Sequence, residues 1–254
     1  MSSTRSDDRK APATSTGSEG LSVILCAHGG VAGCGAAEQH ARRLREGGAF
    51  EDVVACCLRG TPDLAMAFAR VQAPVVAVVP VLMADGYTSR TVLPKAVADA
   101  APDGLVVRIT PPLGTSPGVG DIIARRALLA CRDRGWQAAQ TSLLVAGHGT
   151  VRDPRSGDTA KSTADRLRAG GAFGDARAGF LEQPPLLADV LSELQPKPCV
   201  VAGFFADAGD HAVRDLPSLI NRNHPNAAYL GPIGVDPEVA NVIVELLQAD
   251  ESGR

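Results

Sequence analysis

The chain carries two copies of one sequence pattern, and this internal repeat restricts its possible folds more than any other feature. Four segments of the first half match four segments of the second half at offsets of 120 to 123 residues. The pairs are LCAHGG (25–30) with VAGHGT (145–150), RRLREGGAFED (42–52) with DRLRAGGAFGD (165–175), CLRGTPDLA (57–65) with FLEQPPLLA (180–188), and DGYTSRTVLP (85–94) with AGDHAVRDLP (208–217). A period this long indicates duplication of a whole domain, because solenoid repeats are only about 20–50 residues long.

Short apolar runs alternate with longer stretches of helical spacing throughout both copies. The expected strands are 22–27, 53–58, 75–83, 105–109, 142–146, 176–181, 199–205 and 227–230. The expected helices include 36–47, 63–71, 119–134, 159–169, 186–194 and 237–249. Several of the strands are apolar without alternation, as in strands buried on both faces. The pattern therefore predicts an α/β fold of two duplicated halves, each with a parallel four-stranded sheet between helices.

The chain divides into a tail and two halves. Residues 1–20 are rich in Ser, Thr, Asp and Gly without an apolar period, so we expect a disordered tail. The N-terminal half is assigned to 21–112 and the C-terminal half to 113–254, with PPLGTSPG (111–118) as the connection between them.

Composition narrows the class of protein. The net charge of -3 and the pI of about 6.0 argue against nucleic acid or an anionic membrane as the main partner. No run approaches the ~20 apolar residues that a membrane span needs. The polar start of the chain lacks a secretory signal, and the 6 cysteines form no CxxC pair, so we expect reduced thiols and a cytoplasmic location.

Three reactive residues follow predicted strands of the second half. His148 comes after LLVAG, Glu182 after ARAGFL, and His211 after CVVAGFF and a short loop. Ligands of α/β sheets bind beyond the carboxyl ends of the strands, so these side chains are expected at one edge. Two imidazoles and a carboxylate suit a divalent metal such as Fe, Co, Ni or Zn, and they also suit proton abstraction. A lone histidine there is more often structural, and Glu182 could be a surface residue before a turn, but three such residues together favour a site.

The duplication provides an internal comparison for these three residues. In the first half, His28 corresponds to His148, Arg59 to Glu182, and Thr88 to His211. An arginine repels a metal cation and threonine is a weak ligand. We therefore expect the second half alone to carry the metal chemistry, with one central cleft serving one reaction.

At these residues the chain resembles the class II tetrapyrrole chelatases, which include sirohydrochlorin ferrochelatase and the anaerobic cobaltochelatases. The family pattern is a strand ending in HG, a strand ending in FLE, and G-x-H-x-x-x-D-[IL]-P. Here these are Gly147-His148-Gly149, Phe180-Leu181-Glu182, and the segment from Gly209 and His211 to Pro217. The resemblance covers about residues 21–249.

The resemblance implies two flavodoxin-like half-domains facing each other across a central cleft. It implies a metallochelatase, a lyase that inserts Fe²⁺ or Co²⁺ into sirohydrochlorin or a related free-base tetrapyrrole, in sirohaem or cobalamin biosynthesis. No cofactor beyond the metal substrate is implied. His148, Glu182 and His211 would collect the metal and accept the two pyrrole protons that it displaces.

An acidic tetrapyrrole favours cationic groups at the mouth of the cleft. The candidates for substrate binding are Arg59, Arg90, Arg152, Arg214 and His28, with Arg155 as a further loop arginine. Arg59 is the best of these, because it replaces a ligand position that faces the same cleft. The opposing interpretation is that such loop arginines are only solvated.

Other functions remain open at this stage. A non-catalytic metal carrier or tetrapyrrole-binding protein would use the same fold without proton transfer. A protohaem-type ferrochelatase is weakened by the short chain, although those enzymes also carry the intact residue set in the second half. A hydrolase with His148 as base is disfavoured, because no GxSxG-like nucleophile turn is present.

Overall fold

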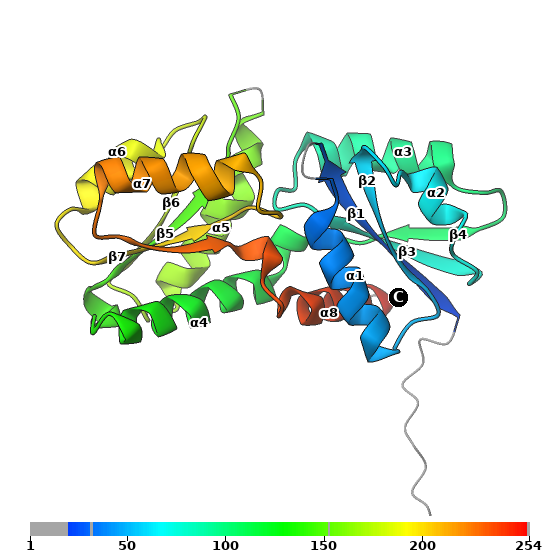
Figure 1. The fold of residues 1–254 in the computed structure, drawn as a ribbon, viewed down its shortest axis with the longest axis horizontal. Coiled ribbons are helices and arrows are strands. Elements are labelled where there is room, and N and C mark those ends of the chain that lie inside the picture. The colour runs from blue at the N-terminus through cyan, green and yellow to red at the C-terminus, as the bar shows by residue number, and fades with distance from the viewer. Residues whose placement is uncertain (1–19, 31–32, 152, 253–254) are drawn as a thin grey trace, which may run out of the picture.

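The computed structural model describes residues 20–30, 33–151 and 153–252 as two lobes side by side (Figure 1). Each lobe is built on one four-stranded sheet, with strand orders β2-β1-β3-β4 and β6-β5-β7-β8. The same order in both sheets fits the internal repeat and confirms the α/β prediction. Residues 1–19 of the expected tail lie outside the described part of the chain, so disorder there stays a prediction.

All strand pairs within the two sheets are parallel. The strands are β1 (Leu21–Gly29), β2 (Val53–Arg59), β3 (Val75–Val81), β4 (Val106–Ile109), β5 (Ser142–Gly147), β6 (Asp175–Phe180), β7 (Cys199–Gly203) and β8 (Ala228–Pro232). Each lies where the apolar runs predict a strand. Strand β1 shows why these runs are continuous: Val23 and Leu25 pack on one face while Ile24 and Cys26 pack on the other. Helices on both faces of the sheet therefore require apolar residues at consecutive positions.

Eight α-helices are seen in the described residues. They are α1 (Gly35–Gly47), α2 (Leu64–Phe68), α3 (Leu93–Ala100), α4 (Pro117–Asp133), α5 (Asp158–Ala169), α6 (Leu187–Leu194), α7 (Leu216–Asn223) and α8 (Val239–Ser252). The sequence pattern did not single out α3 and α7. Each has a proline in its first turn, Pro94 and Pro217, which is favourable at a helix start but reads as a break in a periodic pattern. None of the eight combines the length and the apolar character that a membrane-spanning helix needs.

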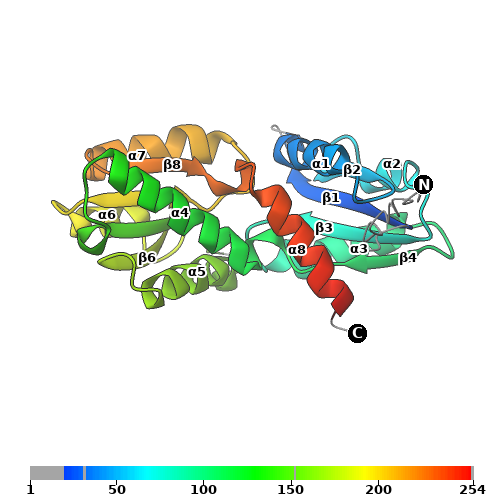
Figure 2. The ribbon, with the colours of Figure 1, turned by 90° about the horizontal axis from the view of Figure 1, so that it is seen from below.

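The helix that follows each sheet in the chain packs against the other lobe. Helix α4 follows β4 of the first sheet, but it contacts β7 and β8 of the second sheet. Helix α8 follows β8 of the second sheet, and it contacts α1 of the first half (Figure 2). As a result one hydrophobic cluster runs through both lobes, and it includes Val23 of β1, Leu143 of β5 and Ile243 of α8. The two sheets are thus fixed relative to each other by a shared core.

A buried histidine ties the two halves together at this shared core. His40 of α1 is fully buried, and its Nε2 donates to the carbonyl oxygen of Gly234, near the end of the chain, at 2.7 Å. Its other ring nitrogen, Nδ1, has no hydrogen-bond partner. Burial lowers the pKa of His40, and the Gly234 carbonyl and two nearby acids oppose that shift only in part. His40 therefore favours the neutral form in the folded protein.

This burial makes stability depend on pH. The unfolded chain binds a proton on His40 near the ordinary pKa of 6.5, whereas the folded protein binds it only at lower pH. The free energy of unfolding should therefore fall as the pH falls through 6.5, with a limiting slope of about 1.4 kcal/mol per pH unit. Urea titrations of the wild type and of His40→Gln across this range measure the effect. Equal slopes for both proteins would contradict the account.

Candidate functional site

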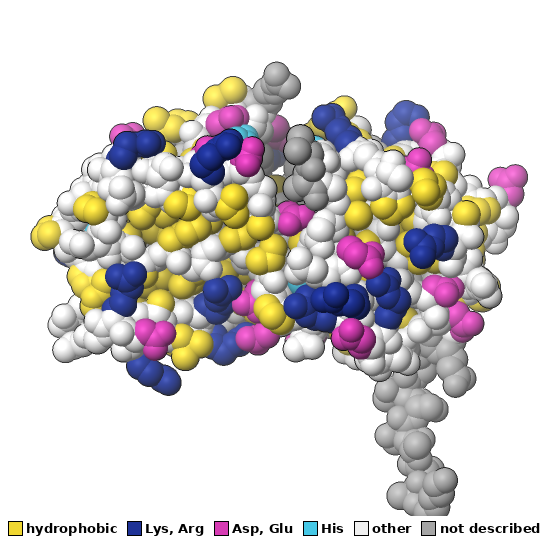
Figure 3. Space-filling model, viewed as in Figure 1, with side chains coloured by type: hydrophobic (Ala, Val, Ile, Leu, Met, Phe, Trp, Pro, Cys, Tyr) yellow, Lys and Arg dark blue, Asp and Glu magenta, His cyan; other side chains and the backbone are white. Residues whose placement is uncertain are grey.

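A cleft of about 630 Å³ lies between the two lobes and is lined by both halves. The first half contributes residues at the end of β1 and after β3, among them His28, Tyr87 and Thr88. The second half contributes residues that follow β5 and β7, among them His148 and His211. Figure 3 shows the hollow between the lobes, with acidic, basic and histidine side chains near its edge. The cleft is thus built from the carboxyl ends of the central strands of both sheets, where parallel sheets bind ligands.

The structure brings His148, Glu182 and His211 together at this cleft. The two imidazole rings meet edge to face, with centroids 4.6 Å apart and an angle of 73° between the planes. The Nε2 atom of His148 lies 3.7 Å from Oε1 of Glu182. Within the described residues, no group of three or more His, Cys, Asp or Glu side chains is arranged so that it could hold a metal ion. His148 thus lies next to both His211 and Glu182, and the roles of the three groups as ligands or bases stay predictions.

The hydrogen bonds of both rings define their tautomers. Nδ1 of His148 lies 2.6 Å from the carbonyl oxygen of Gly149, and Nδ1 of His211 lies 2.8 Å from Oδ2 of Asp215. Both partners are acceptors only, so each Nδ1 carries the proton. Each neutral ring then keeps its lone pair on Nε2, which is the form that binds a metal or accepts a proton.

The loop that carries His148 is held by Gln183, which the sequence analysis did not single out. Gln183 is buried, and its Oε1 accepts hydrogen bonds from the backbone N–H of Thr150 at 2.9 Å and from the hydroxyl of Ser156 at 2.8 Å. Gly149 has a φ of +68°, and a Cβ there would lie 2.5 Å from Cγ of Gln183. The glycine after His148 is therefore required by packing, because it lets the turn close onto the Gln183 side chain.

Of the corresponding first-half residues, the structure places two in the cleft. His28 and Thr88 line it, whereas Arg59 and its counterpart Glu182 are not among the lining residues. Glu182 instead lies behind His148: its backbone N–H donates to the carbonyl oxygen of His148 at 3.0 Å, and its Oε1 lies 3.7 Å from Nε2 of the same histidine. Arg59 is exposed at the end of β2, and its predicted role as a substrate-binding residue stays a prediction.

The other predicted arginines already have acidic partners. Arg90 binds both carboxylate oxygens of Asp85, at 2.6 and 3.0 Å, and holds the pKa of that carboxyl below its usual range. Arg155 binds Asp153 at 3.1 Å, and Arg214 lies 3.1 Å from Asp210. Arg152 lies outside the described residues. A substrate carboxylate would therefore have to compete with an aspartate at each of these three guanidinium groups.

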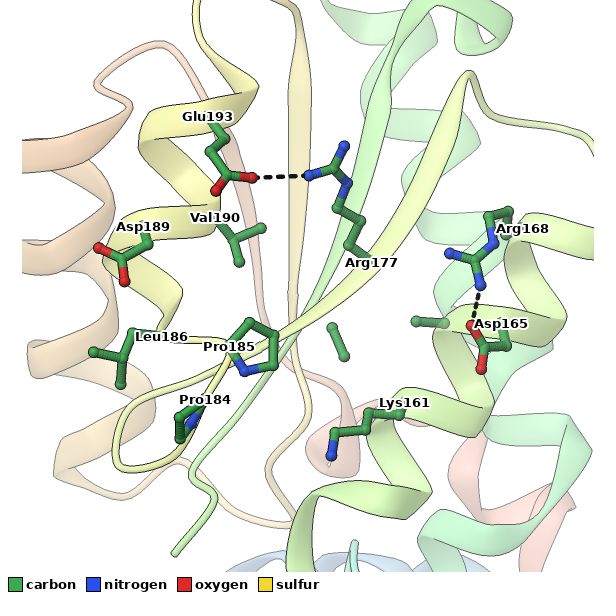
Figure 4. A pocket seen from close by; sticks show the side chains of 12 residues that line it. Lys161, Asp165, Arg168, Arg177, Pro184, Pro185, Leu186, Asp189, Val190 and Glu193 are labelled. Atoms are coloured by element: carbon green, nitrogen blue, oxygen red, sulfur yellow. Dashed lines mark hydrogen bonds and ion pairs between the residues drawn. The ribbon is translucent and has the colours of Figure 1, made fainter. Parts of the chain in front are cut away.

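A second hollow of about 610 Å³ lies away from this cleft, between α5, β6 and α6 (Figure 4). Three cations line it, and each has an acidic partner: Lys161 lies 3.6 Å from Asp158, Arg168 pairs with Asp165, and Arg177 lies 3.1 Å from Glu193. Its charges are balanced within the protein. The central cleft, with three titratable groups converging on it, is the candidate site.

Known proteins are similar to this chain in sequence and in fold. The sequence profile of the CbiX family matches residues 22–129 and 142–250, once in each half. A curated relative from Halobacterium salinarum, named "Probable sirohydrochlorin cobaltochelatase", is 25% identical over 88% of this chain and 89% of its own length. A solved structure described as CbiX, "the terminal Enzyme for Biosynthesis of Siroheme in Denitrifying Bacteria", is 26% identical over 90% of this chain and 98% of its own, with a TM-score of 0.70.

A multi-domain protein of Deinococcus radiodurans is also similar. It is 26% identical over 89% of this chain, with a TM-score of 0.73. This chain spans only 55% of that protein, which is described as similar to chelatases and as having two additional domains. The shared part is therefore the pair of half-domains.

Gln183 provides a test of how the site is supported. Replacing it with alanine leaves the Thr150 N–H and the Ser156 hydroxyl without this acceptor, so we expect a loss of about 1–3 kcal/mol in unfolding free energy. Urea denaturation measures the loss, with Ser156→Ala, which removes only one of the two hydrogen bonds, as the matched control. An equal effect of the two variants would show that Gln183 does not anchor both segments.

Proposed function

Because the chain belongs to the CbiX family, we propose that it is a metallochelatase that inserts a divalent metal, Fe²⁺ or Co²⁺, into sirohydrochlorin or a close relative. The names of two relatives support this substrate but point to different metals. One is named a probable sirohydrochlorin cobaltochelatase, and the other is described as an enzyme of sirohaem biosynthesis. The product would then enter sirohaem or cobalamin biosynthesis. Both metals are similar divalent cations, and the ligand types of the site suit either of them.

The observation that carries the proposal is the meeting of three metal-binding groups at a cleft shared by both halves. Metal insertion converts a divalent cation and a free-base macrocycle with two pyrrole N–H groups into a metal complex and two protons. A site for this reaction needs ligands that hold the cation and bases that take the protons. The His148 and His211 rings, 4.6 Å apart, and the Glu182 carboxylate, 3.7 Å from His148, supply both kinds of group.

Proton transfer follows from the tautomers of the two rings. Since Nδ1 of each ring carries a proton, Nε2 is the free basic atom of both His148 and His211. We assign these two nitrogens and the carboxylate of Glu182 to capture of the metal and to removal of the pyrrole protons. A neutral imidazole with a free Nε2 lone pair is a common general base in proteins.

The cleft also offers apolar surface for a flat macrocycle. Tyr87 lines it and is 63% exposed, and Leu82, Met83 and Phe204 also contribute to its lining. Ligand pockets are lined predominantly by apolar and aromatic side chains with a few polar groups. We assign Arg59, Arg90 and Arg214 to the carboxylates at the edge of the macrocycle. Arg90 and Arg214 would have to exchange their aspartate partners for these carboxylates.

The direct test is anaerobic incubation with sirohydrochlorin and Fe²⁺ or Co²⁺, with the tetrapyrrole absorption followed against a control without protein. His211→Ala should lower the insertion rate by about 10²-fold or more, because it removes a ligand and a base together. His28→Ala, at the corresponding position of His148 in the first half, should cause a much smaller loss.

Three outcomes would revise the proposal. Equal losses in His211→Ala and His28→Ala would show that the first half contributes a ligand. Tight metal binding without any rate enhancement would favour a metal carrier. Insertion into protoporphyrin but not into sirohydrochlorin would favour a protohaem-type ferrochelatase.

A further inference from the structure

His211 and Asp215 lie at the two ends of one turn, and their side chains are hydrogen-bonded to each other. The π-helical turn η5 (His211–Asp215) leads directly into α7, and the Leu216 N–H closes it by donating to the carbonyl oxygen of His211. Nδ1 of His211 lies 2.8 Å from Oδ2 of Asp215. The carboxylate is the acceptor, so the ring presents Nδ1–H to Asp215 and keeps its lone pair on Nε2.

The two histidines of the site differ in the partner that holds them. His148 donates to a neutral carbonyl oxygen, that of Gly149, whereas His211 donates to a charged carboxylate. A hydrogen bond to an anion is stronger than one to a neutral acceptor, and it makes the imidazole a better electron donor. His211 is therefore the more strongly polarised of the two rings.

The first half shows that this pair is not needed to form the turn. The turn η1 (Thr88–Val92) lies at the corresponding position, and the Leu93 N–H closes it by donating to the carbonyl oxygen of Thr88. Thr88 stands in the place of His211, and Val92 in the place of Asp215. The same backbone turn thus forms with neither residue present. The Asp215 carboxylate is therefore not needed for the turn, and its contact is with the His211 ring.

The two carboxylate oxygens of Asp215 have different partners: Oδ1 lies near Arg214, and Oδ2 accepts from the His211 ring. Arg214 lies 3.6 Å from Oδ1 of Asp215 and 3.1 Å from Asp210, so its guanidinium faces the other oxygen. One oxygen therefore meets a cation and the other meets the imidazole. This arrangement holds the carboxylate in one orientation toward His211.

We propose that Asp215 is a positioning residue that fixes the Nδ1–H tautomer of His211 and directs its Nε2 lone pair to the incoming metal. The inference rests on the proposed chelatase function. Asp215 acts through His211 and does not itself touch the metal. Its loss should weaken metal capture and slow insertion without changing the affinity for the macrocycle.

The test uses two variants of the full-length protein. Asp215→Val reproduces the first-half residue Val92, so the turn should still form, and Asp215→Asn keeps an acceptor oxygen without the charge. Titration with Co²⁺ alone, followed by its visible absorption, should show affinity falling in the order wild type, Asp215→Asn, Asp215→Val, with a total loss of about 10–100-fold. The kcat for insertion should fall in parallel, while KM for the tetrapyrrole stays unchanged.

The matched control is Asp210→Ala, which removes the other acidic neighbour of Arg214 and should leave Co²⁺ affinity near the wild-type value. In a His211→Ala background, Asp215→Val should have no further effect. Wild-type affinity in Asp215→Val, or an equal loss with and without His211, would overturn the proposal. Should the wild type bind Co²⁺ through this pair but insert no metal, the positioning role would stand and the chelatase function would fail.

Discussion

The crossing of α4 and α8 between the halves is the constraint on which the rest of the structure depends. A helix that follows one sheet and packs on the other joins the two cores into one, so that the lobes cannot move apart without exposing buried side chains such as Ile243. The carboxyl ends of both sheets are thereby held around a single cleft. His40, buried and bonded to Gly234, adds a polar contact across the same boundary.

Within this symmetric frame, the chemistry is asymmetric. Both halves keep the strand order, the glycine turn after the first strand and the π-helical turn before a short helix. Only the second half combines histidine, glutamate and the His211–Asp215 pair, whereas the first half has His28, Arg59 and Thr88 at the corresponding places. The first half lines the cleft, and its turn shows that the backbone turn forms without the His211–Asp215 pair.

Much of this was predictable from the sequence, because continuous apolar runs and a long repeat are direct consequences of buried parallel strands and duplication. The eight strands and the meeting of His148, Glu182 and His211 follow from strand-end placement alone. The helix crossing was not predictable, because periodicity says which face of α4 is buried but not against which sheet. Gln183 was missed because its partners include a backbone N–H, which leaves no pattern in sequence. Asp215 stands in the G-x-H-x-x-x-D-[IL]-P pattern, but the pattern alone did not assign it a contact with the His211 ring. The pairing of Arg90 with Asp85 was hidden for the same reason.

The central claim is that His148, Glu182 and His211 of the second half collect the metal. X-ray absorption spectroscopy of the Co²⁺-loaded protein tests it most directly, because imidazole, carboxylate and thiolate ligands scatter differently. The account predicts nitrogen and oxygen ligands with the outer-shell signal of two imidazole rings, reduced to one ring in His211→Ala. Sulfur ligands, or an unchanged two-ring signal in His211→Ala, would contradict it.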